Sequence, residues 1–286
     1  MKLSDLSTKE PNTWCPGCTN NGILLAIKKA LVELADEGKI DINKVVTVTG
    51  IGCHAKIFDY LNLSGFYSIH GRVLPTALGI KVANPDLTVI GFGGDGDTYA
   101  EGIAHFVHAC RYNANITLIV HNNQVFALTT GQSTPTTEIG FKGKSTPEGE
   151  KNRPLNPIAL ALISGATFVA RTLAIDIEHA KEVFKAAILH KGFSFVDVLQ
   201  PCITYHNTIQ FFREHTYKIN GPFDFDTALR KSFEWNYTVK EDAKIPIGIF
   251  YSVERETYEE KWTSMKPLYV EEKKRKFEEL LEEFKF

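Results

Sequence analysis

Residues 87–125 read LTVIGFGGDGDTYAEGIAHFVHACRYNANITLIVHNNQV, and this stretch decides the predicted fold. An apolar, β-branched run ends in the glycine-rich acidic loop Gly93–Asp97, a helical pattern follows, and a second apolar run ends in a pair of asparagines. This order predicts strands at Leu87–Gly91 and Ile116–His121 with a helix near Tyr99–Tyr112 between them. The carboxyl ends of parallel strands meet at one edge of a sheet, so the two polar loops are predicted to lie together there.

The same alternation of strand and helix patterns extends to both sides of this unit. Further strands are predicted at Val45–Thr49, Thr167–Ala170 and Phe193–Leu199, and further helices near Asn20–Asp36, Leu74–Val82, Pro157–Ile163 and Ile177–Leu189. Such alternation predicts an α/β fold, with a doubly wound, mostly parallel sheet and helices on both of its faces.

Two segments break this rhythm. The stretch Thr129–Asn156 is rich in Thr, Gly, Lys and Pro, and it is longer than loops without a function usually are. From about Thr204 the pattern is lost, and the chain ends in the charged, helix-like stretch Val270–Phe286. We therefore predict a main domain of residues 1–203 and a less regular C-terminal extension of residues 204–286. The extension either makes subunit contacts or ends in a solvated surface helix.

Composition excludes several classes of protein. The chain is 43% hydrophobic and 23% charged with a formal net charge of −2, and it has no basic stripe, so nucleic acid is not an expected partner. The first residues contain no apolar stretch typical of a secretory signal, and the longest apolar runs, such as Ile116–Val120, are too short to cross a membrane. Five cysteines in a chain of 286 residues do not suggest a disulfide scaffold. We expect a cytoplasmic protein that keeps its thiols for metal binding or catalysis.

Oxygen ligands follow two neighbouring strands. Asp95 lies in the glycine-rich loop, where glycines permit positive φ angles and a close approach of the backbone to a ligand. Asn123 comes 28 residues later, directly after the next strand. Carboxylate and amide oxygens suit Mg²⁺, which often shares its ligands with phosphates. The simpler alternative is a tight turn with a capping aspartate and an ordinary polar loop.

Four of the cysteines lie in loop-like contexts. Cys15 and Cys18 form a Cys-x-x-Cys pair, and Cys53 and Cys202 supply two further thiols. Four thiolates suit either a [4Fe–4S] cluster or a structural zinc, while the pair alone is also compatible with a redox dithiol or with coincidence. Cys110 falls on the apolar side of a predicted helix and is expected in the core.

The position of Cys53 favours a redox centre over zinc. It belongs to the glycine-rich loop Gly50–His54, which follows a strand and is predicted at the same sheet edge as Asp95. A structural zinc has no reason to lie beside a magnesium and phosphate site, whereas an electron acceptor does.

The Gly-Asp-Gly loop followed by the asparagine pair resembles the thiamine diphosphate fingerprint. More widely, the chain resembles the β subunit of the 2-oxoacid:ferredoxin oxidoreductases, a thiamine diphosphate-binding fold of the PP type. The motifs that carry this resemblance are Trp14–Cys18, Gly50–Cys53, His70–Arg72, Gly94–Asp97, Asn123–Thr129, Ser145–Pro147 and Gln200–Cys202.

The resemblance implies a role for each motif. Mg²⁺ is held by Asp95, Asn123 and the main-chain carbonyl of Val125, and a [4Fe–4S] cluster is bound by Cys15, Cys18, Cys53 and Cys202. The thiamine diphosphate is lined by Ile51, Gly52, Cys53, His54, His70, Gly94, Gly96, Asp97, Ala127 and Leu128.

Three further residues have candidate catalytic roles. Lys56 resembles a family lysine that faces the 2-oxoacid, with a solvated lysine as the alternative. His70 lines the cofactor or is a satisfied polar core group, and Arg72 is expected to brace the site. Many relatives carry a Thr-Lys pair where this chain has Thr129–Thr130, which weakens any transfer of substrate preference.

The implied activity is oxidative decarboxylation of a 2-oxoacid with coenzyme A, giving acyl-CoA and CO₂ and passing electrons through the cluster to ferredoxin. The glutamate that thiamine enzymes place against the aminopyrimidine ring is expected from a partner α subunit, since no carboxylate here is assigned to it. The alternatives are a non-redox thiamine decarboxylase or synthase with a structural zinc, and a non-catalytic scaffold of the same fold.

Overall fold

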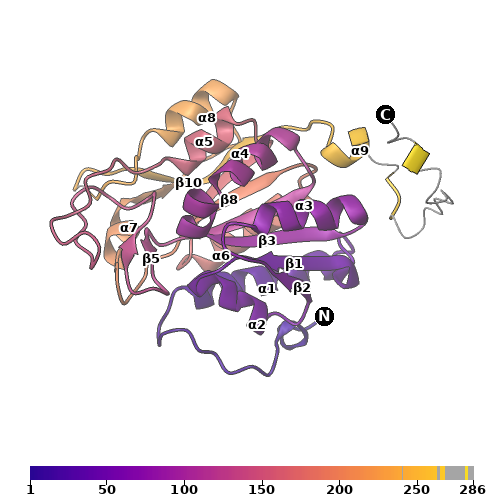
Figure 1. Ribbon diagram of the computed structural model, residues 1–286, viewed down its shortest axis with the longest axis horizontal. Helices are drawn as coiled ribbons and strands as arrows, with labels where there is room; N and C mark the ends of the chain where they lie inside the picture. Colours follow the sequence, from indigo (N-terminus) through magenta and orange to yellow (C-terminus); the bar gives the residue numbers. More distant parts are fainter. Residues whose placement is uncertain (240, 263–264, 268–280, 283–286) are drawn as a thin grey trace.

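The computed structural model describes residues 1–239, 241–262, 265–267 and 281–282, and it contains one large sheet. The sheet has eight strands in the order β2-β1-β3-β4-β8-β7-β10-β9 (Figure 1). These are β1 Val45–Thr49, β2 Ser64–Tyr67, β3 Thr88–Gly94, β4 Ile116–Asn122, β7 Phe168–Leu173, β8 Ser194–Leu199, β9 Thr216–Lys218 and β10 Ile245–Ser252. Every neighbouring pair is parallel except β10 and β7, so the predicted mostly parallel α/β sheet is confirmed.

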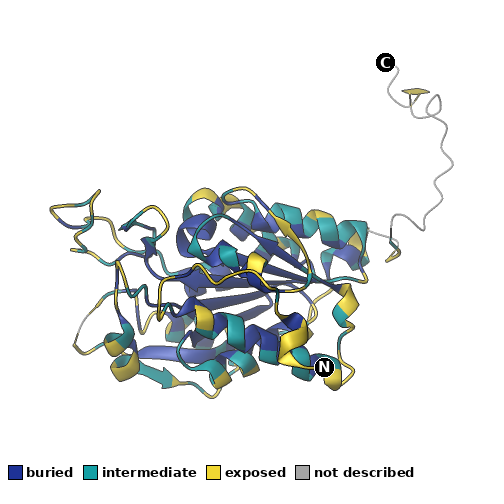
Figure 2. Ribbon diagram, turned by 90° about the horizontal axis from the view of Figure 1, so that it is seen from below, coloured by how far each residue is buried: buried dark blue, intermediate teal, exposed yellow. Residues whose placement is uncertain are grey.

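Helices cover both faces of the sheet. One face carries α1 Asn20–Asp36, α2 Ile57–Tyr60 and α6 Ile177–Leu189, and the other carries α3 Val73–Ala83, α4 Ile103–Tyr112, α5 Pro157–Ile163 and α8 Phe225–Ser232 (Figure 1). Each layer of helices packs on its own apolar core. The central strands β4 and β8 are buried along their whole length, as the dark blue centre of Figure 2 shows. This two-sided burial explains their continuous apolar sequences.

Helix α1 shows how the sequence pattern produces this packing. Ile23, Ile27, Leu31 and Leu34 recur at helical spacing, and all four are fully buried against the sheet and α6. Burying each such side chain contributes about 1.5–3 kcal/mol, so a helix of this kind is stabilised mainly by tertiary packing.

The predicted elements of the main domain are present, with one difference in detail. The helix predicted near Tyr99–Tyr112 is preceded by a π-helical turn at Asp97–Glu101, and α4 begins only at Ile103. Cys110 is fully buried in α4, as predicted. The predicted tail Val270–Phe286 lies outside the described residues apart from residues 281 and 282.

The segment after residue 204 is more regular than its sequence suggested. It contributes α7 Ile209–His215, α8, α9 Tyr258–Trp262 and the strands β9 and β10, which extend the main sheet. The division of the chain at residue 203 stays a prediction. No helix within the described part of the chain has both the length and the apolar character needed to span a bilayer.

A buried polar network joins this later segment to the sheet. Arg171 on β7 and Asp197 on β8 form a fully buried ion pair at 3.3 Å, and Arg171 Nη2 donates a hydrogen bond of 2.9 Å to the hydroxyl of Tyr237. Tyr237 donates to Asp197, and Asn122 Nδ2 at the end of β4 donates to the same carboxylate at 3.0 Å. The network therefore runs from the C-terminal segment to the loop that follows β4.

Candidate functional site

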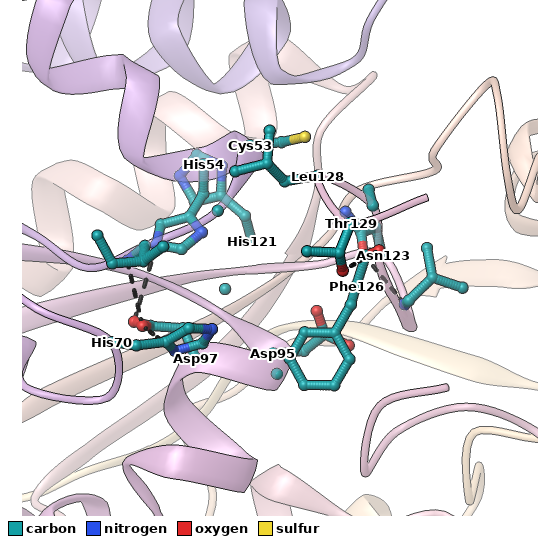
Figure 3. Close-up of a pocket in the computed structure, with 16 residues that line it drawn as sticks. Cys53, His54, His70, Asp95, Asp97, His121, Asn123, Phe126, Leu128 and Thr129 are labelled. Carbon is teal, nitrogen blue, oxygen red and sulfur yellow. Dashed lines mark hydrogen bonds and ion pairs between the residues drawn. The ribbon is translucent and has the colours of Figure 1, made fainter. Parts of the chain in front are cut away.

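The carboxyl ends of β1, β3 and β4 surround one pocket, which we call the cofactor pocket (Figure 3). It contains every residue predicted to line the thiamine diphosphate together with the three predicted magnesium ligands. These are Ile51, Gly52, Cys53, His54, His70, Gly94, Asp95, Gly96, Asp97, Asn123, Val125, Ala127 and Leu128. The pocket also contains Phe126 and Thr129, which belong to the Asn123–Thr129 motif but were not predicted as site residues, and His121, which no motif includes.

Glycines are required in the Gly93–Asp97 loop because a side chain would clash with neighbouring residues, and not because the backbone has positive φ angles. The prediction of positive φ is wrong here, since none of Gly93, Gly94 and Gly96 adopts it. A Cβ atom on Gly96 would lie 2.2 Å from the ring of Phe126, and one on Gly94 would lie 2.7 Å from His54 Nδ1. The loop is therefore packed directly against the other walls of the pocket.

Asp95 is buried at the centre of this loop. Its Oδ2 atom accepts hydrogen bonds from Thr134 Oγ1 at 2.5 Å and from Thr136 Oγ1 at 2.8 Å, both from the long loop 129–156. Burial raises the pKa of the Asp95 carboxyl to about 6, and the two threonine bonds partly oppose this rise. A buried carboxylate of this kind is chemically suited to a divalent cation, whose charge offsets the cost of burial.

Asn123 lies beside Asp95 in the pocket, on the turn that leads into β5 Val125–Phe126. The turn depends on Gln124, which has a φ angle of 62°, and on a 3.1 Å hydrogen bond from the Val125 N–H to Asn123 Oδ1. Strand β5 pairs with β6 Gln132–Ser133, which begins the long loop and directs it back over Asp95. The long loop 129–156 thus supplies Thr134 and Thr136, which hold the Asp95 carboxylate.

Two buried histidines occupy another wall of the pocket (Figure 3). Burial lowers the pKa values of His54 and His121 to about 3, so both rings are neutral. The Nε2 atoms of both rings and Asp97 Oδ2 have no hydrogen-bond partner among the described residues, although His54 Nε2 lies 3.8 Å from Asp97 Oδ2. Buried polar atoms are rarely left unpaired, so these atoms fit a polar ligand such as a phosphorylated cofactor. His121 was not predicted as a site residue, because a single histidine near the end of a strand matches no motif.

The three candidate catalytic residues lie in different places. His70 Nδ1 is 2.9 Å from Asp97 Oδ1, at the edge of the cofactor pocket. Arg72 Nη1 donates to the carbonyls of Gly71 and Glu101, at 3.3 and 3.1 Å, and lines neither of the pockets described here. Lys56 donates to Thr13 Oγ1 and lines a second pocket.

That second pocket, which we call the cysteine pocket, brings together the four predicted cluster ligands, Cys15, Cys18, Cys53 and Cys202. The Cys15–Cys18 segment is a tight turn, closed by a 3.0 Å hydrogen bond from the Cys18 N–H to the Cys15 carbonyl. Pro16 and Gly17 suit its two central positions, and Gly17 has a φ angle of 78°. The turn directs both thiols toward one site.

The thiols influence one another electrostatically. Burial, followed by the neighbouring Cys202, Cys18 and Cys15, raises the pKa of the Cys53 thiol to about 11. Thr204 Oγ1 lies within hydrogen-bonding distance of Cys15 Sγ, at 3.6 Å. Within the described residues, no three His, Cys, Asp or Glu side chains are grouped tightly enough to bind a single metal ion.

The two pockets share a wall. Cys53, Asn123, Ala127 and Leu128 line both of them. The sequence predicted that Cys53 and Asp95 lie at the same edge of the sheet, and this is confirmed.

Comparisons with known proteins agree with this geometry. Residues 50–198 match the family described as the thiamine pyrophosphate enzyme, C-terminal TPP-binding domain, and residues 202–267 match the pyruvate ferredoxin oxidoreductase β subunit, C-terminal family. The 2-oxoacid:ferredoxin oxidoreductase subunit β of Saccharolobus solfataricus is 45% identical, over 92% of this chain and 89% of that protein. The 2-oxoglutarate synthase subunit KorB of Archaeoglobus fulgidus is 37% identical, over 91% of each chain.

A solved structure has the same fold. It is a 2-oxoglutarate:ferredoxin oxidoreductase from Magnetococcus marinus with 2-oxoglutarate, coenzyme A and succinyl-CoA bound, and it is 30% identical with a TM-score of 0.88. The match covers 100% of this chain and 97% of that one. With its thiamine diphosphate-binding domain, the chain belongs to the family of 2-oxoacid:ferredoxin oxidoreductase β subunits.

Proposed function

We propose that the chain catalyses, with a partner α subunit, the oxidative decarboxylation of a 2-oxoacid with coenzyme A, and that it transfers the electrons through its own [4Fe–4S] cluster to ferredoxin. The observation that carries the proposal is the wall shared by the cofactor pocket and the cysteine pocket. An electron donor and acceptor that touch the same four residues are close enough for direct transfer, without an additional carrier.

Different residues of the cofactor pocket would bind different parts of the cofactor. Asp95, Asn123 and the carbonyl of Val125 would hold Mg²⁺ against the diphosphate, because hard oxygen atoms suit this ion. The neutral rings of His54 and His121 offer unpaired nitrogen atoms without adding charge. When bound, thiamine diphosphate supplies the carbanion chemistry that releases CO₂ from a 2-oxoacid.

The residues of the cysteine pocket would hold the cluster. Its ligands would be the thiolates of Cys15, Cys18, Cys53 and Cys202, all of which line this pocket. A [4Fe–4S] cluster spaces its thiolates over four iron atoms, so it does not require the tight grouping of ligands that a single zinc ion needs. The Thr204 hydroxyl beside Cys15 would tune the reduction potential by hydrogen bonding to sulfur.

Substrate contact is proposed for Lys56 and His70. Lys56 lines the cysteine pocket and His70 lines the cofactor pocket, and Leu128 lines both. Both are therefore adjacent to the shared wall, where the reacting carbon has to be close to the electron acceptor. Arg72 would fix the turn at Gly71 through its bonds to two carbonyl groups. The α subunit would supply the glutamate for the aminopyrimidine ring.

Metal analysis of the complex tests this proposal. The chain is produced with its α subunit, purified without oxygen, and analysed for iron and zinc, and a panel of 2-oxoacids is assayed with coenzyme A and a viologen acceptor. We expect brown protein with about four iron atoms per chain and reduction that depends on thiamine diphosphate. Colourless protein that contains zinc would instead support a non-redox thiamine enzyme.

A further inference from the structure

The side chain of Gln200 connects the cofactor pocket to the cysteine pocket. Gln200 follows β8 directly, is buried with 1% of its surface exposed, and lines the cysteine pocket. Its backbone N–H donates a 2.8 Å hydrogen bond to the Asn122 carbonyl, which fixes it beside the asparagine pair. Among the described residues, its side chain forms hydrogen bonds only with residues at or next to the proposed metal ligands.

The orientation of the Gln200 amide is determined by a carbonyl group. Gln200 Nε2 donates to the Pro201 carbonyl at 3.2 Å and to Thr19 Oγ1 at 2.7 Å. The Thr19 hydroxyl donates in turn to the same Pro201 carbonyl, at 2.8 Å. A carbonyl oxygen only accepts hydrogen bonds, so the NH₂ end of Gln200 has to face Pro201 and Thr19. Its oxygen therefore has to face the other way.

The oxygen of Gln200 in turn determines the orientation of Asn123. Gln200 Oε1 accepts a 3.1 Å hydrogen bond from Asn123 Nδ2. This leaves Asn123 Oδ1 on the opposite side, where it accepts from the Val125 N–H and retains a second lone pair. If the Asn123 amide were reversed, its NH₂ group would replace the oxygen atom that a hard cation requires.

The same hydrogen bonds reach both halves of the cysteine site. Thr19 follows Cys18 in the chain, and Pro201 precedes Cys202. Thr19 is buried, like Gln200, so these bonds are shielded from water. One side chain is thus bonded to the magnesium loop and to the neighbours of two proposed cluster ligands.

We propose that Gln200 is a positioning residue that holds the amide oxygen of Asn123 toward Mg²⁺ and fixes this ligand relative to the two cysteine-bearing segments. This inference rests on the proposed function, because it takes Asn123 as a magnesium ligand. Partners of this kind, which orient a metal ligand without touching the metal, typically contribute ten- to a hundredfold to affinity.

Two substitutions at the same position separate orientation from packing. Gln200→Leu and Gln200→Met both remove the acceptor for Asn123, and Gln200→Met also keeps an unbranched side chain of similar length in the buried site. Gln210→Leu is the matched control. Gln210 is exposed on α7, and among the described residues its side chain bonds only to Glu214. The measurement is calorimetry of thiamine diphosphate binding to the αβ complex over a series of Mg²⁺ concentrations, with iron content determined in parallel.

We expect Gln200→Leu to raise the Mg²⁺ concentration needed for half-maximal binding by about ten- to a hundredfold. Gln200→Met is expected to raise it by a similar factor, and Gln210→Leu to leave it unchanged. If Gln200→Leu does not give a folded complex, Thr19→Val provides the test. It keeps Gln200 but removes one of the two anchors of its NH₂ group, so the Mg²⁺ requirement should still rise.

The possible outcomes separate this inference from the proposed function. If the parent complex binds no thiamine diphosphate at any Mg²⁺ concentration, the proposed function is wrong and the inference is wrong with it. If the parent complex binds and Gln200→Leu has the same Mg²⁺ requirement, only the inference is overturned. A higher Mg²⁺ requirement in Gln200→Leu with a normal one in Gln200→Met would also overturn it, because this would indicate a packing role without orientation of Asn123.

Discussion

The two carboxylates at the centre of the pocket, Asp95 and Asp97, are both buried but have different hydrogen-bond partners. Asp95 is held by two threonine hydroxyls, and burial raises the pKa of its carboxyl. Asp97 instead accepts backbone hydrogen bonds from Ile51 at 3.2 Å and from Gly71 at 2.8 Å, so it ties three loops together. The protein therefore fixes Oδ2 of Asp95 through the long loop, while Oδ1 of Asp97 maintains the shape of the pocket and its Oδ2 has no hydrogen-bond partner among the described residues.

At Asp95 the change to test is Asp95→Asn. It keeps an oxygen for the threonines but removes the negative charge, so we expect Mg²⁺-dependent binding of thiamine diphosphate to weaken by more than about a hundredfold, beyond the loss typical of outer-shell partners. Iron content should not change. Asp86→Asn is the control, since Asp86 is exposed and lies away from the pocket. Calorimetry on the αβ complex is the measurement, and unchanged binding in Asp95→Asn would refute the magnesium assignment.

The cysteines allow an equally direct comparison. Cys202→Ala should abolish the cluster, because it removes one of the four thiols that line the cysteine pocket. Cys110→Ala should leave the iron content unchanged, because Cys110 is fully buried in the apolar core beneath α4, although the lost packing lowers stability by about 1 kcal/mol. Iron analysis and the visible spectrum report the result, and loss of iron in Cys110→Ala would contradict the ligand assignment.

Residues that bind a metal or cofactor directly are easier to predict from the sequence than residues that only position those ligands. Asp95, Asn123 and the Cys15–Cys18 pair were identifiable because ligand chemistry limits the residue types and their order. Gln200 was part of a motif of the family resemblance but had no role of its own, and His121 gave no signal, because a single histidine at a strand end is equally compatible with an ordinary polar core group. Their roles depend on which side chains the fold brings beside them.

Among the elements, central strands and amphipathic helices were predictable, and strands at or next to the edges of the sheet were not. The bounds of β1, α1, α5 and α6 agree with the sequence pattern because each has a clear apolar period. Strand β10 was missed because Pro246 and Gly248 interrupt its apolar run, and both residues normally argue against a strand interior. All four residues of β2 are exposed at the edge of the sheet, so no burial pattern could mark them.

The long loop 129–156 is held to the site at its base. Glu138 lies 2.7 Å from His206 Nε2 and accepts from Gln124 Nε2 at 3.3 Å, so it joins the loop to the segment after Cys202 and to the magnesium turn. We expect Glu138→Ala to lower the free energy of unfolding by about 1–3 kcal/mol, because it leaves the buried His206 Nε2 without this partner and Gln124 Nε2 with only the Thr136 carbonyl.

Urea unfolding of the complex measures this effect. Glu148→Ala is the control from the same loop. Glu148 is exposed, and among the described residues it pairs only with Lys151, which is also exposed. Its effect should be below about 0.5 kcal/mol. Equal effects of the two substitutions would show that Glu138 does not anchor the loop.

Across the whole molecule, the Arg171–Asp197–Tyr237 network joins the C-terminal segment to the centre of the sheet. Arg171→Leu would leave Asp197 as a buried charge without its cation, which typically costs about 3–5 kcal/mol. Asn122 bonds to the same carboxylate, so the disturbance should extend to the cofactor pocket and weaken thiamine diphosphate binding as well. Denaturant unfolding together with calorimetry tests both effects, and a variant with normal stability would exclude this structural role.

The molecule as a whole brings an oxygen-lined cofactor pocket and a thiol-lined pocket against one wall. The most direct test of this account is electron paramagnetic resonance of the αβ complex, frozen shortly after mixing with a 2-oxoacid in the presence or absence of thiamine diphosphate. We predict the signal of a reduced [4Fe–4S] cluster on this chain only when thiamine diphosphate and Mg²⁺ are present, and its loss in Cys202→Ala. A complex that turns over 2-oxoacid while this chain contains no iron would contradict the account.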